Sequence, residues 1–340
     1  MSLCSRVKNF LLLLNFSPDV CKKLISYNNY KQKKEVNRVM IAFVFPGQGS
    51  QYVGMGKDIY DGFEEVREIH NKVNEKLGFN LTEIIFNDEG KLNLTQYTQP
   101  AILLTSYLIY KIFNNKKSIN PSFLAGHSLG EFTALTVAGS LSIEDAVYLT
   151  YIRGSLMQSA VPEGKGLMAA VIGLDANKIE EILKTIDSVV EIANYNSYEQ
   201  TVISGETEAV KKAMEVLKSQ GAKKVVPLAV SVPAHSSLLK EKAKEFAKYI
   251  EDTPFNDAKI PVISNITATP ITKAQEIKEE LKAHFYSPVK WVQTVEFLAN
   301  NGVKTVYEIG PKKVLTGLIK RINGNLELKN IETLQDVENA

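Results

Sequence analysis

Cysteine is nearly absent from this sequence of 340 residues. The two cysteines, Cys4 and Cys21, both lie within residues 1–39, which leaves the rest of the chain without a thiol. A chain segment without thiols can hold no disulfide, no cysteine nucleophile and no cysteine metal site. Cysteine chemistry is therefore excluded from the body of the protein.

Histidine is also scarce, and its scarcity limits both metal binding and catalysis. The chain has 4 histidines, and no two of them stand at the spacing of a zinc-binding helix. We therefore expect no metal site. A histidine that acts as a general base must come from the same short set, which is His70, His127, His235 and His284.

The chain has no strong excess of charge of either sign. Its formal net charge is +2, of which residues 1–39 carry +6 and the remainder carries −4. A slightly acidic body gives no electrostatic reason to expect a nucleic acid partner. The apolar run from Phe10 to Phe16 is too short to span a membrane, so we expect no membrane partner.

Residues 1–39 form a leader with three possible origins. It could be an organellar transit peptide, a weak secretory signal, or upstream sequence translated from a misassigned start codon. We favour the third, because Met40 immediately precedes a well-patterned strand and the codons of Lys33 to Val36 can form a purine-rich run resembling a ribosome-binding site. We then expect the leader to be disordered or not native, and the protein to be bacterial and cytoplasmic. A genuine transit peptide would instead make it organellar.

The stretch Gly126 to Gly130 (Gly-His-Ser-Leu-Gly) predicts a nucleophile elbow around Ser128. Residues 122–125 predict a short buried strand, and residues 129–138 predict a helix. Glycines two before and two after the serine let the backbone turn sharply without a collision, and the helix start offers free N–H groups to an oxyanion. From the pentapeptide alone, a Gly-rich turn with a capping serine remains the alternative.

A second glycine-rich loop, Pro46 to Gln51, follows a predicted buried strand at residues 41–45. It fails as a phosphate loop. Tyr52 stands where G-x-G-x-x-G needs its third glycine, and Gln51 stands where a Walker A loop ending at Gly56-Lys57 needs its first. The glycines of this loop must therefore serve another purpose.

A serine nucleophile needs a base, and histidine is the usual one because its pKa lies near neutrality. The side chain of His127 should diverge from that of its neighbour Ser128, and His70 lies in a charged predicted helix, where we expect a surface role. His235 follows a strand and a Pro-containing turn, whereas His284 lies near a helix end. The loop position favours His235 over His284 as the base.

Helices alternate with short apolar strands along the body, which predicts a mainly parallel, doubly wound α/β core. Residues 58–77 predict one helix. The element order β-α-β-β-α-β after Gly164 is that of a ferredoxin-like unit. We therefore expect an α/β core made of residues 40–163 and 231–340, with a ferredoxin-like subdomain inserted at residues 164–230.

Five motifs together carry a resemblance to a known family. In their order along the chain, from Met40 to about Ile322, they closely resemble malonyl-CoA:acyl carrier protein transacylase of type II fatty acid synthesis. The resemblance implies an α/β-hydrolase-like core with an inserted ferredoxin-like subdomain. The motifs are Phe45–Gln51, Gly126–Glu131, Arg153-Gly154, Val232–His235 and Tyr307–Pro311.

The resemblance also implies roles for single residues. Ser128, helped by His235, would take the malonyl group of malonyl-CoA as an ester and pass it to the phosphopantetheine thiol of acyl carrier protein in a ping-pong reaction. Backbone N–H groups of Gln48 and Leu129 would hold the oxyanion. Arg153, which alone would read as an ordinary surface residue of a helix, would bind the free carboxylate of malonate. Malonyl-CoA and holo acyl carrier protein are then substrates; we expect no cofactor, and a monomer.

One position departs from the family pattern. The family usually orients its histidine through a backbone carbonyl just before a Tyr-x-Pro sequence, commonly at a glutamine, whereas this chain has His284 there. We expect the backbone contact to survive the change. The side chain differs, however, and could alter the pKa of His235 or the shape of the pocket.

Three other functions fit parts of the pattern. A serine thioesterase or esterase would use water as the acceptor, but no acidic residue stands in a compelling place between Ser128 and His235, and Arg153 would have no purpose. A polyketide-type acyltransferase would load another extender unit, and a free-standing chain argues against it. An inactive module that binds carrier protein would be expected to have lost Ser128 or His235. Its basic patch would be Lys312, Lys313, Lys320 and Arg321.

Overall fold

The computed structural model describes residues 40–162, 164–228, 230 and 232–340. The predicted leader, residues 1–39, lies outside the described residues, as do Glu163, Ala229 and Ser231, which stand at the predicted subdomain boundaries. Those boundaries therefore stay a prediction. The body of the chain, Ile41–Ala340, forms a compact unit of its own.

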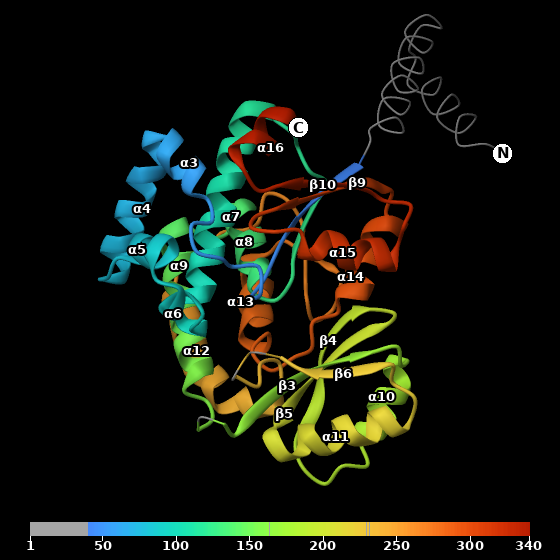
Figure 1. Cartoon of the computed structure of the whole chain (residues 1–340). Coiled ribbons are helices and arrows are strands. Elements are labelled where there is room, and N and C mark those ends of the chain that lie inside the picture. The colour runs from blue at the N-terminus through green and yellow to red at the C-terminus, as the bar shows by residue number, and fades with distance from the viewer. Residues whose placement is uncertain (1–39, 163, 229, 231) are drawn as a thin grey trace, which may run out of the picture. The chain divides into compact units, whose positions relative to one another are not determined.

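A six-stranded sheet forms the centre of the body (Figure 1). Its strand order is β10-β9-β1-β2-β7-β8. The β10–β9, β1–β2 and β2–β7 pairings are parallel, as the alternating pattern predicted, and the short β7–β8 pairing is antiparallel. The strands are β1 (Met40–Phe45), β2 (Phe123–Gly126), β7 (Val262–Ile263), β8 (Pro270–Ile271), β9 (Val303–Ile309) and β10 (Glu327–Ile331).

The register of β1 and β2 brings two loops together. Phe45, the last residue of β1, pairs with Gly126, the last residue of β2. Because both strands run in the same direction, the glycine-rich loop after β1 and the Ser128 turn after β2 leave the sheet at the same edge. The sequence alone could not fix this register, yet it decides that the two glycine motifs form one site.

Long helices cover the sheet. α7, α8 and α9 pack against one another, and α8 also contacts β2 and β7. The rings of Phe43 and Tyr307, on β1 and β9, meet edge to face at 5.6 Å, and full burial of such a side chain stabilises the fold by roughly 1.5–3 kcal/mol. The helices of this part are α3 (Lys57–Gly62), α4 (Glu64–Leu77), α5 (Leu81–Asn87), α6 (Glu89–Leu92), α7 (Thr95–Lys117), α8 (Leu129–Val137), α9 (Ile143–Gln158), η1 (Ser237–Leu239), α12 (Lys240–Asp252), α13 (Ala274–Ala283), α14 (Trp291–Asn300), α15 (Val314–Ile322) and α16 (Leu334–Asn339).

A second, antiparallel sheet has the order β4-β5-β3-β6, and two helices connect its strands (Figure 1). Together with the chain order, this is the ferredoxin-like topology that the sequence predicted. Side chains alternate along β3: Ala169 and Val171 pack toward the helices, while Met168 and Ala170 belong to a separate cluster on the other face. The elements are β3 (Gly166–Ile172), α10 (Ala176–Leu183), β4 (Val190–Ser197), β5 (Gln200–Glu206), α11 (Thr207–Ser219) and β6 (Lys224–Pro227).

Two local expectations were wrong. The single helix predicted for residues 58–77 is two helices, because Phe63 adopts an extended conformation between α3 and α4. His70 does not lie on the surface; it is 4% exposed, and its Nδ1 lies 2.8 Å from the Thr82 hydroxyl. Val66, His70 and Val73 form the buried stripe of α4, a spacing that was readable from the sequence but was outweighed by the charged residues around it.

Candidate active site

Ser128 occupies a strained turn between β2 and α8. Its φ and ψ are 52° and −111°, a backbone conformation that side-chain-bearing residues rarely adopt. A Cβ atom on Gly126 would lie 1.9 Å from the carbonyl carbon of Gly130, and one on Gly130 would lie 2.1 Å from the Phe45 oxygen. The two glycines are therefore required for close backbone approach. This is the steric argument by which the sequence predicted a nucleophile elbow.

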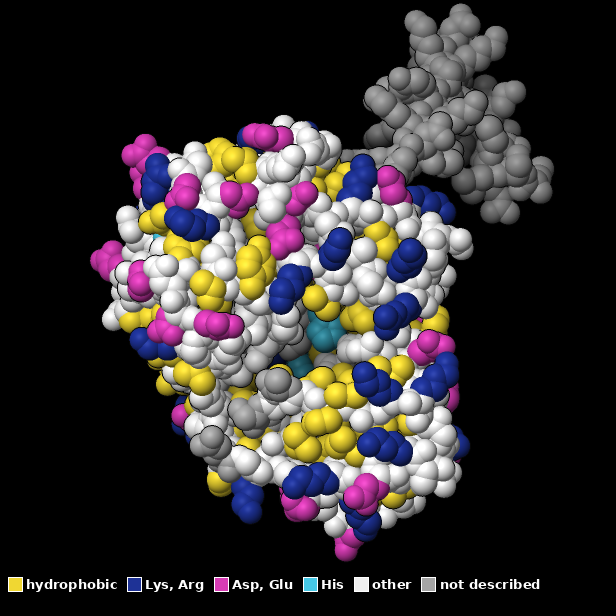
Figure 2. All heavy atoms as spheres, viewed as in Figure 1, with side chains coloured by type: hydrophobic (Ala, Val, Ile, Leu, Met, Phe, Trp, Pro, Cys, Tyr) yellow, Lys and Arg dark blue, Asp and Glu magenta, His cyan; other side chains and the backbone are white. Residues whose placement is uncertain are grey.

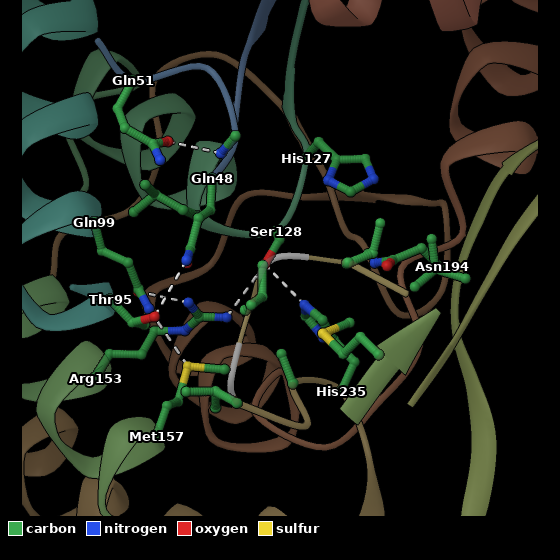
Figure 3. A pocket seen from close by; sticks show the side chains of 18 of the residues that line it. Gln48, Gln51, Thr95, Gln99, His127, Ser128, Arg153, Met157, Asn194 and His235 are labelled. Carbon is green, nitrogen blue, oxygen red and sulfur yellow. Dashed lines mark hydrogen bonds between the residues drawn. The ribbon is translucent and has the colours of Figure 1, made fainter. Parts of the chain in front are cut away.

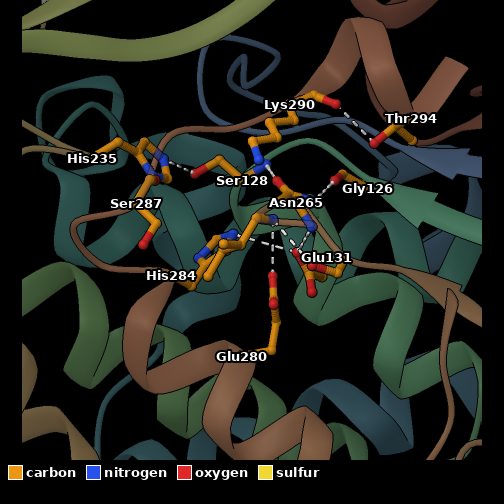
Figure 4. A network of polar contacts seen from close by, with 12 residues as sticks. Gly126, Ser128, Glu131, His235, Asn265, Glu280, His284, Ser287, Lys290 and Thr294 are labelled. Carbon is orange, nitrogen blue, oxygen red and sulfur yellow. Dashed lines mark hydrogen bonds and ion pairs between the residues drawn. The ribbon is translucent and has the colours of Figure 1, made fainter. Parts of the chain in front are cut away.

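Asn265 holds this turn in place, and the sequence pattern did not single it out. Its Oδ1 accepts a 2.7 Å hydrogen bond from the Ser128 N–H, and its Nδ2 donates at 2.7 Å to the Gly126 carbonyl (Figure 4). Asn265 is 1% exposed and follows β7, the strand next to β2. The signal that could have found it is a polar residue just after a short apolar run, because ligand-contacting groups gather at the carboxyl ends of parallel strands.

We expect Asn265→Ala to slow acylation of Ser128 about 10-fold to 100-fold, because the strained turn loses both of its amide contacts. The loss of buried hydrogen bonds should also cost about 1–3 kcal/mol of stability. Quench-flow measurement of the acyl-enzyme and a thermal melt check the two effects. Asn301→Ala, at an exposed helix end, is the control. Acylation at the unaltered rate in Asn265→Ala would contradict the role given to this residue.

His235 faces the serine with the correct nitrogen. Its Nε2 lies 2.8 Å from Ser128 Oγ, and its Nδ1 lies 2.9 Å from the carbonyl oxygen of Ser287 (Figure 3, Figure 4). A carbonyl only accepts, so Nδ1 must carry the proton, and Nε2 is left as an acceptor for the serine hydroxyl. The pair thus has the geometry of a nucleophile and its general base, and the orienting group is a carbonyl instead of a carboxylate.

The carbonyl that orients His235 is only partly the expected one. The backbone of His284 was expected to hold the base, but the carbonyl at hydrogen-bond distance from Nδ1 is that of Ser287, three residues later. The His284 carbonyl also acts on the ring, and both carbonyls raise the pKa of His235. The helix α13 ends at Ala283, so the chain from His284 to Ser287 curls around the imidazole and presents more than one carbonyl to it.

The histidines at positions 127 and 70 lie apart from this pair. The ring of His127 turns away from Ser128, as expected (Figure 3). Its Nε2 lies 2.8 Å from Asn196 Oδ1 on β4, and the ring packs edge to face on Trp291. His70 lies in α4 and does not line the cavity beside Ser128. The candidate base is therefore His235.

Burial strongly lowers the pKa of His235, and the positive charge of Arg153 lowers it further, to about 3. Ordinary histidine has a pKa of about 6.5. The imidazole therefore stays neutral, and able to accept the serine proton, well below neutral pH.

This shift predicts an unusual pH profile. A base is active when deprotonated, so a lowered pKa moves the loss of activity to lower pH, and we expect kcat/KM for acyl loading to stay level from about pH 8 to about pH 5. Initial rates in overlapping buffers measure it, with samples returned to about pH 7.5 to control for unfolding. A decline centred at the ordinary histidine pKa of about 6.5 would contradict the assignment.

Arg153 lies in α9 and is 2% exposed. Its Nη1 donates to Gln99 Oε1 at 2.6 Å, and its Nη2 lies 3.4 Å from Ser128 Oγ (Figure 3). Nη2 also lies 3.3 Å from His284 Nδ1. Burial lowers the pKa of Arg153 to about 10, so the guanidinium remains charged at neutral pH. No carboxylate of the described residues lies within ion-pair distance of it. A buried cation without a direct counter-ion is a site for an anionic ligand.

The loop after β1 reaches the elbow. A Cβ atom on Gly47 would lie 2.4 Å from the His127 carbonyl oxygen, so glycine is needed for the close approach, and Gly49 has a positive φ of 102°. The backbone N–H groups of Gln48 and Leu129 make no hydrogen bond to any part of the chain that the structure describes. The Gln48 side chain donates to Thr95 Oγ1 at 3.1 Å.

A cavity of about 630 Å³ joins these groups. Its floor holds Ser128, His235 and Arg153, and part of its wall is the face of the smaller sheet that carries Met168 and Val202. Figure 2 shows it as a hollow with histidine at its base and Lys and Arg side chains gathered beside it. The volume suits an organic ligand of cofactor size. Within the described ranges, no cluster of three or more His, Cys, Asp and Glu residues could hold a metal ion, and no helix is long and apolar enough to cross a membrane.

Known proteins are similar to this chain in sequence and in fold. Residues 42–334 match the family model of the acyl transferase domain. A malonyl CoA-acyl carrier protein transacylase of Staphylococcus aureus is 44% identical over 301 residues, which cover 87% of this chain and 97% of that protein. One of Bacillus subtilis is 41% identical over 304 residues, covering 88% and 96%.

A solved structure of a type II PKS acyl-carrier protein in complex with its malonyl-transacylase matches with a TM-score of 0.86 and 40% identity. The match covers 88% of this chain and 98% of that one. The agreement in fold therefore extends over most of the chain. The chain is an acyltransferase and belongs to the acyl transferase domain family, within its group of malonyl CoA-acyl carrier protein transacylases.

Proposed function

We propose that this protein transfers a malonyl group from malonyl-CoA to the phosphopantetheine thiol of acyl carrier protein, for fatty acid synthesis. The observation that carries the proposal is the placement of Arg153: this buried cation, which has no direct counter-ion among the described residues, lies 3.4 Å from the hydroxyl of Ser128. An acyl group that carries its own carboxylate would supply the missing charge. The names of the relatives point to the same reaction.

In the first half-reaction, Ser128 Oγ attacks the thioester carbonyl of malonyl-CoA while its proton passes to His235 Nε2. The carbonyl oxygen becomes an oxyanion, which the N–H groups of Gln48 and Leu129 stabilise; removal of one such donor costs about 3 kcal/mol in other acyl-transfer enzymes. When the intermediate collapses, the C–S bond breaks and the CoA sulfur takes the proton from His235. Malonyl-Ser128 and free CoA result.

In the second half-reaction, the thiol of the carrier protein takes the place of CoA. It gives its proton to His235 Nε2 and attacks the ester carbonyl, and the same two N–H groups hold the oxyanion. The C–O bond to Ser128 then breaks, and Oγ recovers the proton from the imidazole. The enzyme returns to its starting state, so the reaction is a ping-pong acyl transfer.

Arg153 would select the acyl group. Its planar guanidinium can hold a carboxylate by two parallel hydrogen bonds. The group is held in place by the 2.6 Å hydrogen bond from Nη1 to Gln99 Oε1. An acetyl group would leave the cation without a partner in a buried site, which is costly. The pocket therefore favours malonyl over acetyl.

The proposal also covers cofactors, the division of the chain, the oligomeric state and the location of the protein. No step needs a metal or a cofactor, because malonyl-CoA is already an activated thioester and the carrier protein supplies the accepting thiol. The subdomain at residues 164–230 supplies one wall of the cavity, and residues 40–163 and 231–340 supply the catalytic groups. We propose a monomer that works in the bacterial cytoplasm, where malonyl-CoA and acyl carrier protein meet.

The test is a labelling experiment with [14C]malonyl-CoA, run with and without holo acyl carrier protein. We expect a labelled protein without the carrier, with the label on Ser128 in a peptide digest, and transfer of the label to the carrier thiol when it is added. Release of the label as free malonate would instead support a hydrolase. Preferential labelling by methylmalonyl-CoA would support a polyketide-type acyltransferase, and no labelling at all would contradict every version of the serine mechanism.

A further inference from the structure

The side chain of His284 lies between two buried ionisable side chains, of which the proposed mechanism uses only Arg153. It is 1% exposed and lies between Arg153 and Glu131, which are 2% and 0% exposed. Its Nδ1 lies 3.3 Å from Arg153 Nη2. Its Nε2 lies 3.5 Å from Glu131 Oε2 (Figure 4). The proposed mechanism uses only the backbone of this residue, so the position of its ring needs a separate explanation.

Donor and acceptor chemistry decides the state of the ring. A guanidinium only donates, so the contact with Arg153 requires Nδ1 to be an unprotonated acceptor. The ring proton then lies on Nε2, which faces the carboxyl of Glu131. Burial, together with the positive charge of Arg153, lowers the pKa of His284 well below its ordinary value, in agreement with a neutral ring.

The contacts continue beyond His284 and return to the nucleophile. Glu131 Oε2 accepts a 3.0 Å hydrogen bond from the backbone N–H of Asn265, whose side chain holds the Ser128 N–H at 2.7 Å. Arg153 Nη2, at 3.4 Å from Ser128 Oγ, completes a closed ring of polar contacts. We call these five residues the buried ring: Ser128, Arg153, His284, Glu131 and Asn265.

Besides Ser128, two polar side chains hold the guanidinium. Gln99 holds Nη1, and His284 lies against Nη2. The rings of Phe132 and Phe285 lie 5.7 Å and 5.8 Å from the guanidinium carbon and restrict its tilt. Without His284, the guanidinium would keep only the Gln99 hydrogen bond and the longer 3.4 Å contact with Ser128 Oγ. The His284 contact is the one that directs Nη2 toward the acyl site.

We propose that neutral His284 is a positioning residue for Arg153, and that it thereby sets the preference for acyl groups that carry a carboxylate. The inference rests on the proposed function. It concerns selectivity and not the attack by Ser128, because His284 touches neither reacting atom in the proposed mechanism.

The test compares two variants at this position. His284→Leu removes the acceptor, whereas His284→Gln keeps a carbonyl oxygen for Arg153 and an amide donor for Glu131. We expect the leucine variant to lower kcat/KM for malonyl loading about 10-fold to 100-fold, mainly through KM, with acetyl loading changed less than about 3-fold, since hydrogen bonds to charged groups are worth that much. The glutamine variant should restore malonyl loading.

His70→Leu is the matched control, because His70 is also a buried histidine whose Nδ1 bonds to another side chain, and it does not line the cavity. It should leave the ratio of malonyl to acetyl loading unchanged. An unchanged ratio in His284→Leu would overturn the inference, and so would an equal fall for both acyl groups, which would indicate only a structural role.

A spectroscopic measurement tests the contact without relying on activity. In the [15N]histidine-labelled protein, the signals that disappear in His284→Gln belong to His284 and should show a neutral ring with its proton on Nε2 from about pH 5.5 to 8.5. A proton on Nδ1, or a charged ring, would overturn the inference. Absence of malonyl loading in the unaltered protein would overturn the proposed function, whereas normal loading with unaltered selectivity in His284→Leu overturns this inference alone.

Discussion

Replacing Ser128 with alanine is expected to abolish the labelled acyl-enzyme and to lower malonyl transfer about 10⁴-fold or more. Alanine removes the hydroxyl oxygen that lies 2.8 Å from His235 Nε2, so neither half-reaction has its nucleophile or leaving oxygen. Residual transfer would come from binding and the oxyanion N–H groups alone, which is the pattern seen when other serine enzymes lose this residue. Single-turnover labelling with malonyl-CoA measures the effect directly.

The matched control for this change is Ser155→Ala. Ser155 lies in α9, and its hydroxyl bonds to the carbonyl of Tyr151 within the same helix, so its loss should leave labelling unaltered. An acyl-enzyme that persists in Ser128→Ala would place the nucleophile elsewhere. Loss of transfer with a normal acyl-enzyme would mean that the serine ester is not on the reaction path.

Replacing Arg153 with alanine should affect malonyl loading and acetyl loading differently. We expect malonyl loading to fall about 10²-fold to 10³-fold, because a carboxylate placed in this buried site would have no cation, while acetyl loading stays level or rises. Arg153→Lys should recover only part of the loss, since an ammonium lacks the planar fork that binds both carboxylate oxygens. Parallel loading assays with malonyl-CoA and acetyl-CoA give the ratio.

Arg67→Ala is the control for the loss of an arginine. Arg67 bonds to carbonyl oxygens of Tyr60 and Asp61, which lie outside the cavity lining. Equal losses for malonyl and acetyl in Arg153→Ala would remove the proposed role in selectivity and leave Arg153 as a general support for the site.

The roles of residues that stand in a recognisable local motif could be predicted from the sequence. The backbone around Ser128 packs so closely that only glycine fits at positions 126 and 130. Because that requirement fixes the residue type, the elbow could be recognised from the sequence. The choice of His235 followed from its position after a strand, and the structure places its Nε2 at 2.8 Å from Ser128 Oγ. The element order likewise predicted a mainly parallel central sheet and the ferredoxin-like order of the smaller sheet, but not the strand order of the central sheet.

Contacts made by the backbone were not predictable in the same way. The carbonyl at hydrogen-bond distance from His235 Nδ1 belongs to Ser287. Every residue has a backbone carbonyl, so the residue type does not indicate which carbonyl makes this contact. Asn265 was missed because its partners, the N–H of Ser128 and the carbonyl of Gly126, lie far away in the chain and become neighbours only through the β2–β7 pairing. Register and loop path, which the sequence does not specify residue by residue, decide both contacts.

The backbone conformation of the catalytic pair has a consequence for stability. Ser128 and His235 are two of five described non-glycine residues with positive φ, at 52° and 58°. Such conformations cost roughly 1–3 kcal/mol each, which is a large share of the 5–15 kcal/mol by which a typical domain is stable. The rest of the fold must supply that free energy. Substitutions that weaken the fold far from the cavity would therefore reduce the amount of active enzyme in the cell without touching its chemistry.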